Sequence, residues 1–166
     1  MIVDDLVKGP GSWLSMAKDT GVVISSRIRL ARNIKGASFP DWARDDDVVA
    51  LRDTLFEALK GREAFKGYLF LDASALDPVD KDVLEERHPI SHELASKKKG
   101  AGLIVSEDEH MAIMVNEEDH IRMQAICPGM ELLSLWERLD SLDTLLEEST
   151  QYAFTSDLGY LTACPS

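Results

Sequence analysis

Residues 101–126 read AGLIVSEDEHMAIMVNEEDHIRMQAI, and this stretch decides the fold. It holds three apolar runs with the length of a strand, at 101–106, 111–116 and 121–126. The charged segments EDEH and EEDH separate these runs. Strands joined by connections this short pair with their neighbours in the chain, so we expect an antiparallel meander.

Helix-like and strand-like patterns flank the meander on both sides. We expect further strands at 22–30, 67–74 (short and buried), 152–157 and 160–166, and helices at 45–60, from Asp77-Pro78 to near His88, and at 130–148. The last helix carries leucines at three- and four-residue spacing, so one face of it should pack on the sheet. The expected fold is therefore α+β, with helices backing a largely antiparallel sheet.

Composition bounds the class of protein. The chain has 166 residues, 45% of them apolar, which suffices for one sizeable core, so we interpret 1–166 as a single domain. Asp and Glu outnumber Lys and Arg by 30 to 18, and the net charge of -12 should repel nucleic acid and anionic membranes and attract cationic partners. No apolar run reaches the roughly 18 residues of a membrane span, and the start has acids where a signal peptide has basic residues. Two cysteines are too few for a disulfide scaffold, so we expect a cytoplasmic protein.

Arg27 and Arg29 lie two residues apart on the strand expected at 22–30. Both guanidinium groups should therefore leave one face of the strand, while Ile28 points into the core. The chain contains neither GxxxxGK[ST] nor GxGxxG, so any phosphate must be held by side chains. Two adjacent guanidinium groups suit a polyphosphate because each makes bidentate, charge-assisted hydrogen bonds. From spacing alone, two solvated cations on an exposed strand face remain the simpler interpretation.

A second polar cluster, NEEDHIR at 116–122, lies at a strand-to-strand connection. The alternation of the following strand puts Arg122 and Gln124 on one face, so Arg122 could look across at Arg27 and Arg29. Glu118 could then bind a guanidinium substrate or accept its proton. The alternative is a hydrated turn whose charges pair with one another.

Histidine and cysteine add weaker signals. His88 and His92 are four residues apart, but Pro89 interrupts the helix that would align them, so we predict no metal site formed by protein side chains. Cys164 ends an apolar strand, where a small buried residue is the default interpretation. A reactive thiolate would need cationic neighbours that a sequence cannot show.

Four motifs carry a family resemblance in order and spacing: SSRIRLARN at 25–33, ERHPIS at 86–91, NEEDHIR at 116–122 and YLTACPS at 160–166. The chain resembles the ATP:guanidino phosphotransferases, or phosphagen kinases. The short lead of 24 residues with its SWLS segment is similar to the bacterial protein-arginine kinases within that superfamily. The resemblance implies a catalytic domain of the glutamine-synthetase/guanido kinase type.

The resemblance also implies roles for particular residues. Magnesium would be bound through the ATP, and the γ-phosphoryl of ATP would move to an arginine guanidinium. The implied nucleotide-binding residues are Ser25, Ser26, Arg27, Ile28 and Arg29 for the phosphates, His88 for the adenine and Arg122 for the phosphates again. The implied catalytic residues are Glu118, which would orient the guanidinium, and Cys164, which matches the family's thiol beside it.

Two departures from the family pattern stand out. Pro89 and His92 occupy positions where relatives more often read HLISP, which affects the expected shape of the adenine side. In the family, CPS continues into a TNxGTG loop, further arginines and a second carboxylate, and these are not in the sequence. We therefore expect 1–166 to be a C-terminally truncated catalytic domain that alone has no turnover and binds ATP weakly.

The resemblance implies arginine-containing protein substrates. It also suggests a stress-response repressor, a zinc-binding activator, a Clp-type protease and a homodimer of the full-length protein, but no nucleic acid or membrane. A kinase of a small guanidino metabolite and a non-catalytic nucleotide-binding or scaffold module are the alternative functions.

Overall fold

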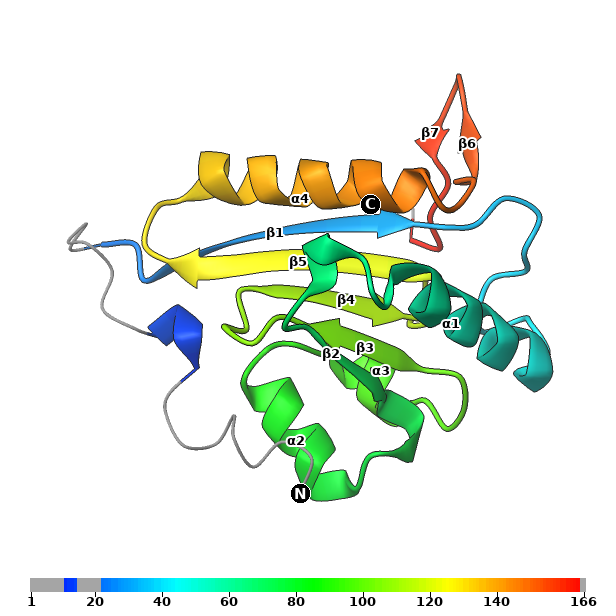
Figure 1. The fold of residues 1–166 in the computed structure, drawn as a ribbon, viewed down its shortest axis with the longest axis horizontal. Coiled ribbons are helices and arrows are strands. Elements are labelled where there is room, and N and C mark those ends of the chain that lie inside the picture. The colour runs from blue at the N-terminus through cyan, green and yellow to red at the C-terminus, as the bar shows by residue number, and fades with distance from the viewer. Residues whose placement is uncertain (1–10, 15–21, 165–166) are drawn as a thin grey trace.

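The computed structural model describes residues 11–14 and 22–164, and its centre is one antiparallel sheet. Five strands lie in the order β1-β5-β4-β3-β2 (Figure 1). Their bounds are β1 Ser25–Arg32, β2 Leu69–Asp72, β3 Gly102–Val105, β4 Met111–Val115 and β5 Ile121–Pro128. The predicted meander is confirmed as β3-β4-β5, because each of these strands pairs antiparallel with the next.

Four α-helices accompany the sheet in the described part of the chain: α1 Asp45–Leu59, α2 Pro78–Glu86, α3 His92–Ser96 and α4 Leu132–Glu147. Short 3-10 turns are η2 Ser12–Leu14, η3 Glu63–Phe65 and η4 Ala73–Ala75. The predicted helices are confirmed as α1, α2 and α4. Asp77 caps α2 as expected, since its Oδ1 accepts the Asp80 backbone N–H at 2.9 Å.

The five-residue helix α3 was not predicted. Its first turn depends on Ser91, whose hydroxyl accepts the Leu94 backbone N–H at 3.1 Å. Two other predictions needed correction. The strand at 67–74 was expected to be buried, but β2 is an edge strand and Leu69 is 42% exposed. The last two strands shrink to the hairpin β6 Phe154–Thr155 and β7 Gly159–Tyr160, so Cys164 lies beyond the strand.

Apolar side chains alternate between the two faces of the sheet, and each face has its own helices. Ile113 and Met123 pack with Leu139 of α4 on one face, which we call the α4 face and which α1 shares. Met114 packs with Leu84 of α2 on the opposite face, where α3 also contributes. Figure 1 shows α4 running along β1, with the β6-β7 hairpin at the C-terminal ends of both.

The second face is covered unevenly. Among the described residues, the core cluster beneath α2 and α3 draws its buried strand residues from β3 and β4 and none from β1 or β5. Over β1 and β5 this face carries Arg27, Arg29, Arg122 and Gln124 instead, as the pairing of Arg29 with Gln124 and of Ala31 with Arg122 requires. We call this surface the open face. The alternation predicted for Arg27, Ile28 and Arg29 is confirmed, because Ile28 packs against the core on the α4 face.

Polar contacts join α4 to β1. The Nε of Arg32 lies 3.1 Å from both carboxylate oxygens of Asp143, and its guanidinium stacks 3.7 Å from the ring centroid of Tyr160. At the other end of β1 the Ser26 hydroxyl donates to the Gly129 carbonyl at 2.6 Å. These contacts and the leucine stripe together hold α4 in register with β1.

The leucine stripe of α4 gives a stability prediction. Leu139 is 0% exposed, so Leu139→Ala should lower the free energy of unfolding by about 2 to 5 kcal/mol, through lost burial and a residual cavity. Leu133 lies on the same helix and is 80% exposed, so Leu133→Ala should change it by less than about 0.5 kcal/mol. Urea titration followed by circular dichroism measures both. Equal effects of the two substitutions would contradict this placement of α4.

Candidate functional site

An open cavity of about 520 Å³ lies at the end of the open face, where three distant segments meet. β1, the β4-β5 connection and the segment after β7 all contribute to it. Its lining residues are Arg29, Leu30, Ala31, Arg32, Asp119, Arg122, Tyr160, Thr162 and Cys164. Three residues predicted from the sequence, Arg29, Arg122 and Cys164, are thus brought together.

Arg27 lies on the open face between this cavity and His88. Partial burial and the charge of Arg29 lower the pKa of Arg27, and burial together with the charge of Arg27 lowers the pKa of His88. Neither Arg27 nor Arg29 has a carboxylate partner among residues 11–14 and 22–164. In a chain with 30 acidic residues, two neighbouring arginines without an acid leave their charge available to an anionic ligand.

The NEEDHIR segment is buried rather than hydrated. Glu117, Asp119 and His120 are 0%, 1% and 1% exposed, so the hydration expected in the hydrated-turn alternative is wrong for them. The pairing of charges within the segment, which the same alternative expected, is confirmed by the contacts of Arg122 with Glu117 and Glu118. Glu118 is the exception, with a side chain that is 44% exposed and an Oε2 that lies 3.7 Å from Nη2 of Arg122. Glu118 is thus not part of the cavity lining, but it lies beside Arg122, which is, and its carboxylate is accessible to a ligand.

Asp119 and Asn33 hold the C-terminal segment against the cavity. The Asn33 side-chain amide donates to Asp119 Oδ1 at 2.5 Å and to the Leu161 carbonyl at 3.0 Å. The same Asp119 oxygen accepts the Ala163 backbone N–H at 2.7 Å. The neighbouring Cys164 is exposed, which corrects the default interpretation of a buried residue. Asn33 and Asp119 were missed as contributors, although both stand inside the quoted motifs.

His120 has a structural position behind the site. Its Nδ1 accepts the Ile34 backbone N–H at 3.1 Å, and its Nε2 lies 2.9 Å from the Ser38 carbonyl. These partners require a neutral imidazole with the proton on Nε2. Burial lowers the pKa of His120, in agreement with the neutral form.

His88 lies at the other end of the open face. It has a left-handed backbone conformation, with φ 74°, and its ring centroid is 4.9 Å from that of Trp13. Its carbonyl accepts a hydrogen bond from the Gln124 side chain on β5. A cavity of about 460 Å³ opens beside these rings, between η2 and α2. The role of His88 at an adenine stays a prediction.

The remaining predicted residues lie on both sides of β1. Ser25 shares the face of Arg27, whereas the side chains of Ser26 and Ile28 point to the α4 face. The Ser26 hydroxyl is also engaged there, since it accepts the Glu131 backbone N–H at 3.2 Å. Ser26 and Ile28 could therefore reach a ligand on the open face through their backbone atoms alone.

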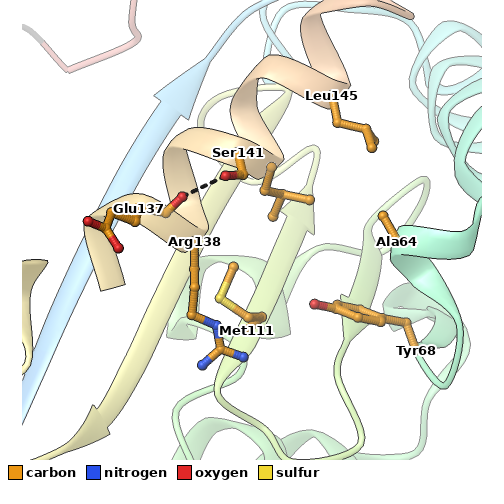
Figure 2. Close-up of a pocket in the computed structure, with 8 residues that line it drawn as sticks. Ala64, Tyr68, Met111, Glu137, Arg138, Ser141 and Leu145 are labelled. Carbon is orange, nitrogen blue, oxygen red and sulfur yellow. Dashed lines mark hydrogen bonds between the residues drawn. The ribbon is translucent and has the colours of Figure 1, made fainter. Parts of the chain in front are cut away.

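Another cavity, of about 430 Å³, lies between α4 and the η3-β2 segment (Figure 2). The Arg138 side chain and the Tyr68 ring lie on opposite sides of it, with Met111 between them (Figure 2). Within the described part of the chain, Arg138 is the single cation of its lining, and its Nη2 lies 3.9 Å from Asp108 Oδ2. No site residue predicted from the sequence lines it, and its described lining residues include no pair of guanidinium groups that would suit a polyphosphate.

Comparison with known proteins identifies the family of the chain. A family model described as ATP:guanido phosphotransferase, C-terminal catalytic domain, matches residues 48–166, which is most of the chain. The chain belongs to this family. The matched range includes His88, Glu118, Arg122 and Cys164 and begins after β1.

Sequence relatives are more specific. The chain is 42% identical over 160 residues to a protein-arginine kinase of Clostridium acetobutylicum, a match that covers 93% of this chain and 46% of the relative. It is 36% identical to a protein-arginine kinase of Halothermothrix orenii, over 100% of this chain and 48% of the relative. The chain thus spans about half the length of the curated relatives it matches.

Solved structures share the fold. A taurocyamine kinase from Schistosoma mansoni with bound transition-state-analogue components matches with a TM-score of 0.80 and 24% identity, over 87% of this chain and 22% of that one. A lombricine kinase matches with a TM-score of 0.77 and 23% identity, over 96% of this chain and 47% of that one. The α+β fold predicted for this family is therefore confirmed.

His120 gives a prediction for the pH dependence of stability. Its folded pKa lies below the ordinary 6.5, so the unfolded chain binds this proton more readily. The stabilisation is complete above that value and is lost as the pH falls below it. We expect His120→Gln to flatten the fall in melting temperature between about pH 7.5 and 5.5. His92→Gln, at a side chain that is 80% exposed, is the matched control and should leave the slope unchanged. A slope in His120→Gln equal to that of the parent chain would contradict the assignment.

Proposed function

We propose that this chain is part of a kinase that transfers the γ-phosphoryl of ATP to arginine guanidinium groups in proteins. The observation that carries the proposal is the pair Arg27 and Arg29, without acidic partners in the described chain, aligned with Arg122 on one face of the sheet. Glu118 and Cys164 stand at the end of this row, where a cationic substrate would meet the phosphates. The relatives at 36% and 42% identity, both named protein-arginine kinase, support the choice of substrate.

The open face suits an extended nucleotide. His88 and Trp13 offer flat surfaces at one end, and the three arginines follow toward the cavity. Residues 27 to 31 of β1 span about 13 Å at the usual rise of a strand, a distance on the scale of an extended triphosphate. The donors on this face are guanidinium groups, which fit phosphate oxygens. Among the described residues no three His, Cys, Asp or Glu side chains are grouped for a metal, so Mg²⁺ is proposed to be bound through the ATP.

The reaction is an in-line phosphoryl transfer. A guanidinium nitrogen of the substrate attacks the γ-phosphorus, the bond from phosphorus to the β,γ-bridging oxygen breaks, and ADP leaves. Glu118 would hold the guanidinium by charge-assisted hydrogen bonds and take the proton that the attacking nitrogen loses. Arg29 and Arg122 would offset the negative charge that develops on the phosphates, and the Cys164 thiol would lie beside the guanidinium. The magnesium ion, bound to the same phosphates, would supply further positive charge.

Charge also favours a cationic protein substrate. The net charge of -12 attracts arginine-rich segments and repels nucleic acid. Among the described residues, no helix is both long enough and apolar enough to cross a bilayer. A cytoplasmic location, where ATP is available, belongs to the same proposal. The single-domain organisation stays a prediction from length and composition. A homodimer and contacts with a repressor, a zinc-binding activator and a Clp-type protease stay predictions from the resemblance.

Phosphoryl transfer is tested with the complete gene product that carries this chain. We expect acid-labile phosphate to form on an arginine-rich protein incubated with ATP and Mg²⁺, and little to form on free arginine or creatine. Preference for the free compounds would instead identify a small guanidino-metabolite kinase. ATP binding without transfer to either substrate would favour the non-catalytic module.

The assignment of Arg27 and Arg29 to the ATP phosphates is tested by substitution. Arg29→Ala and Arg27→Ala should each weaken ATP binding by about tenfold or more, since each removes charge-assisted hydrogen bonds to phosphate. Arg138→Ala is the matched control, because it removes an arginine from the α4 face and should leave ATP affinity unchanged. Isothermal titration calorimetry measures the three affinities. Unchanged affinity in both open-face variants would remove the phosphate assignment.

A further inference from the structure

Glu117 is a buried carboxylate to which no role has yet been assigned. Its side chain is 0% exposed, although it precedes the accessible Glu118. Its Oε2 lies 2.5 Å from Nη1 of Arg122, and its Oε1 accepts a hydrogen bond from the Ser91 hydroxyl. The two neighbouring acids of the NEEDHIR segment are therefore separated by the fold, one buried and one open to a ligand.

Because Glu117 is buried, its carboxylate depends on the contact with Arg122. A carboxylate removed from water is costly unless a cation and hydrogen bonds compensate it, and Arg122 is the cation that does so. The side chain of Arg122 is 19% exposed and lines the 520 Å³ cavity, so its guanidinium touches Glu117 and also reaches the site. Since Arg122 cannot swing away without leaving a buried charge unpaired, Glu117 limits where the guanidinium can lie.

The hydrogen bond with Ser91 extends this contact to the other end of the open face. Ser91 follows His88 by three residues and begins α3. The segment 88–91 is also held to β5 through the Gln124 side chain, which donates to the His88 carbonyl. The buried carboxylate of Glu117 thus connects the segment 88–91 with Arg122. These two parts of the site are more than 30 residues apart in the sequence.

We propose that Glu117 is a positioning residue that aims Arg122 at the nucleotide phosphates and couples this arginine to the His88 segment. The inference rests on the proposed kinase function. Glu117 itself does not touch the substrate in this arrangement, because its carboxylate is buried behind Arg122. Loss of its charge should therefore act on phosphate binding through Arg122.

A double-mutant cycle in the complete gene product tests the proposal. Glu117→Gln keeps the size of the side chain and removes its charge, so we expect ATP affinity to fall by about tenfold as Arg122 loses its fixed position. In an Arg122→Gln background the same substitution should change ATP affinity by less than about twofold, because the group through which Glu117 acts is gone. A purely structural Glu117 would lower affinity to the same extent in both backgrounds, which would overturn the inference.

Two further variants keep the test decisive. Glu117→Asp retains the buried charge but shortens its reach, so it should fold and still bind ATP more weakly than the parent protein; parent-like affinity would overturn the inference. Asp72→Asn is the matched control, since it breaks a 2.6 Å carboxylate–arginine contact with Arg52 on the opposite edge of the sheet. It should leave ATP affinity unchanged, and melting temperatures recorded in parallel report any general loss of structure.

The same experiment separates this inference from the proposed function. A parent protein that binds no ATP overturns both together. A parent protein that binds ATP and phosphorylates arginine, with a Glu117→Gln variant that binds equally tightly, overturns the positioning role alone.

Discussion

The alternation of side chains along β1 and β5 is the constraint on which the rest of the molecule depends. Successive residues of a strand point to opposite faces, so Ile28 enters the core beneath α4 while Arg27 and Arg29 leave by the other face. The helices α2 and α3 cover the half of that face made by β3 and β4, as the core cluster beneath them shows. The arginines therefore stay at the surface, where their desolvation costs little. Two strands supply both part of the core and the row of cations.

A second layer of organisation lies in the buried polar connection between β4 and β5. Glu117, Asp119 and His120 are almost fully buried, and each has its partner in a distant part of the chain. Asp119 meets Asn33 and the backbone of the C-terminal segment, whereas Glu117 meets Ser91 and an arginine of β5. Buried polar groups are stable only when they are paired, so these residues hold the surrounding segments in fixed relative positions. Through Asp119 this connection also contributes to the lining of the cavity next to Cys164.

The sequence predicted most of the fold because its signals are local. The meander, the leucine stripe of α4 and the capped start of α2 each show in fewer than 30 consecutive residues. The helix α3 escaped because five residues give no measurable periodicity and its cap follows a proline-containing segment. The edge position of β2 was not predicted, because an apolar strand looks the same in sequence whether one or two neighbouring strands pair with it.

In the candidate site, too, some features follow from the sequence and others from the tertiary structure. By itself the sequence determined that Arg27 and Arg29 share one face of their strand and that Arg122 and Gln124 share one face of theirs, since strand period is a property of adjacent residues. The pairing of β1 with β5 decided that the two faces coincide. Only the tertiary structure decided that Cys164 is exposed, and that Glu117 is buried against Arg122 while Glu118 remains open. Exposure and pairing depend on which segments meet in space, here across as many as 128 positions between Asn33 and Leu161. Two adjacent glutamates are chemically alike in the sequence, and the packing of segments from elsewhere in the chain makes them different.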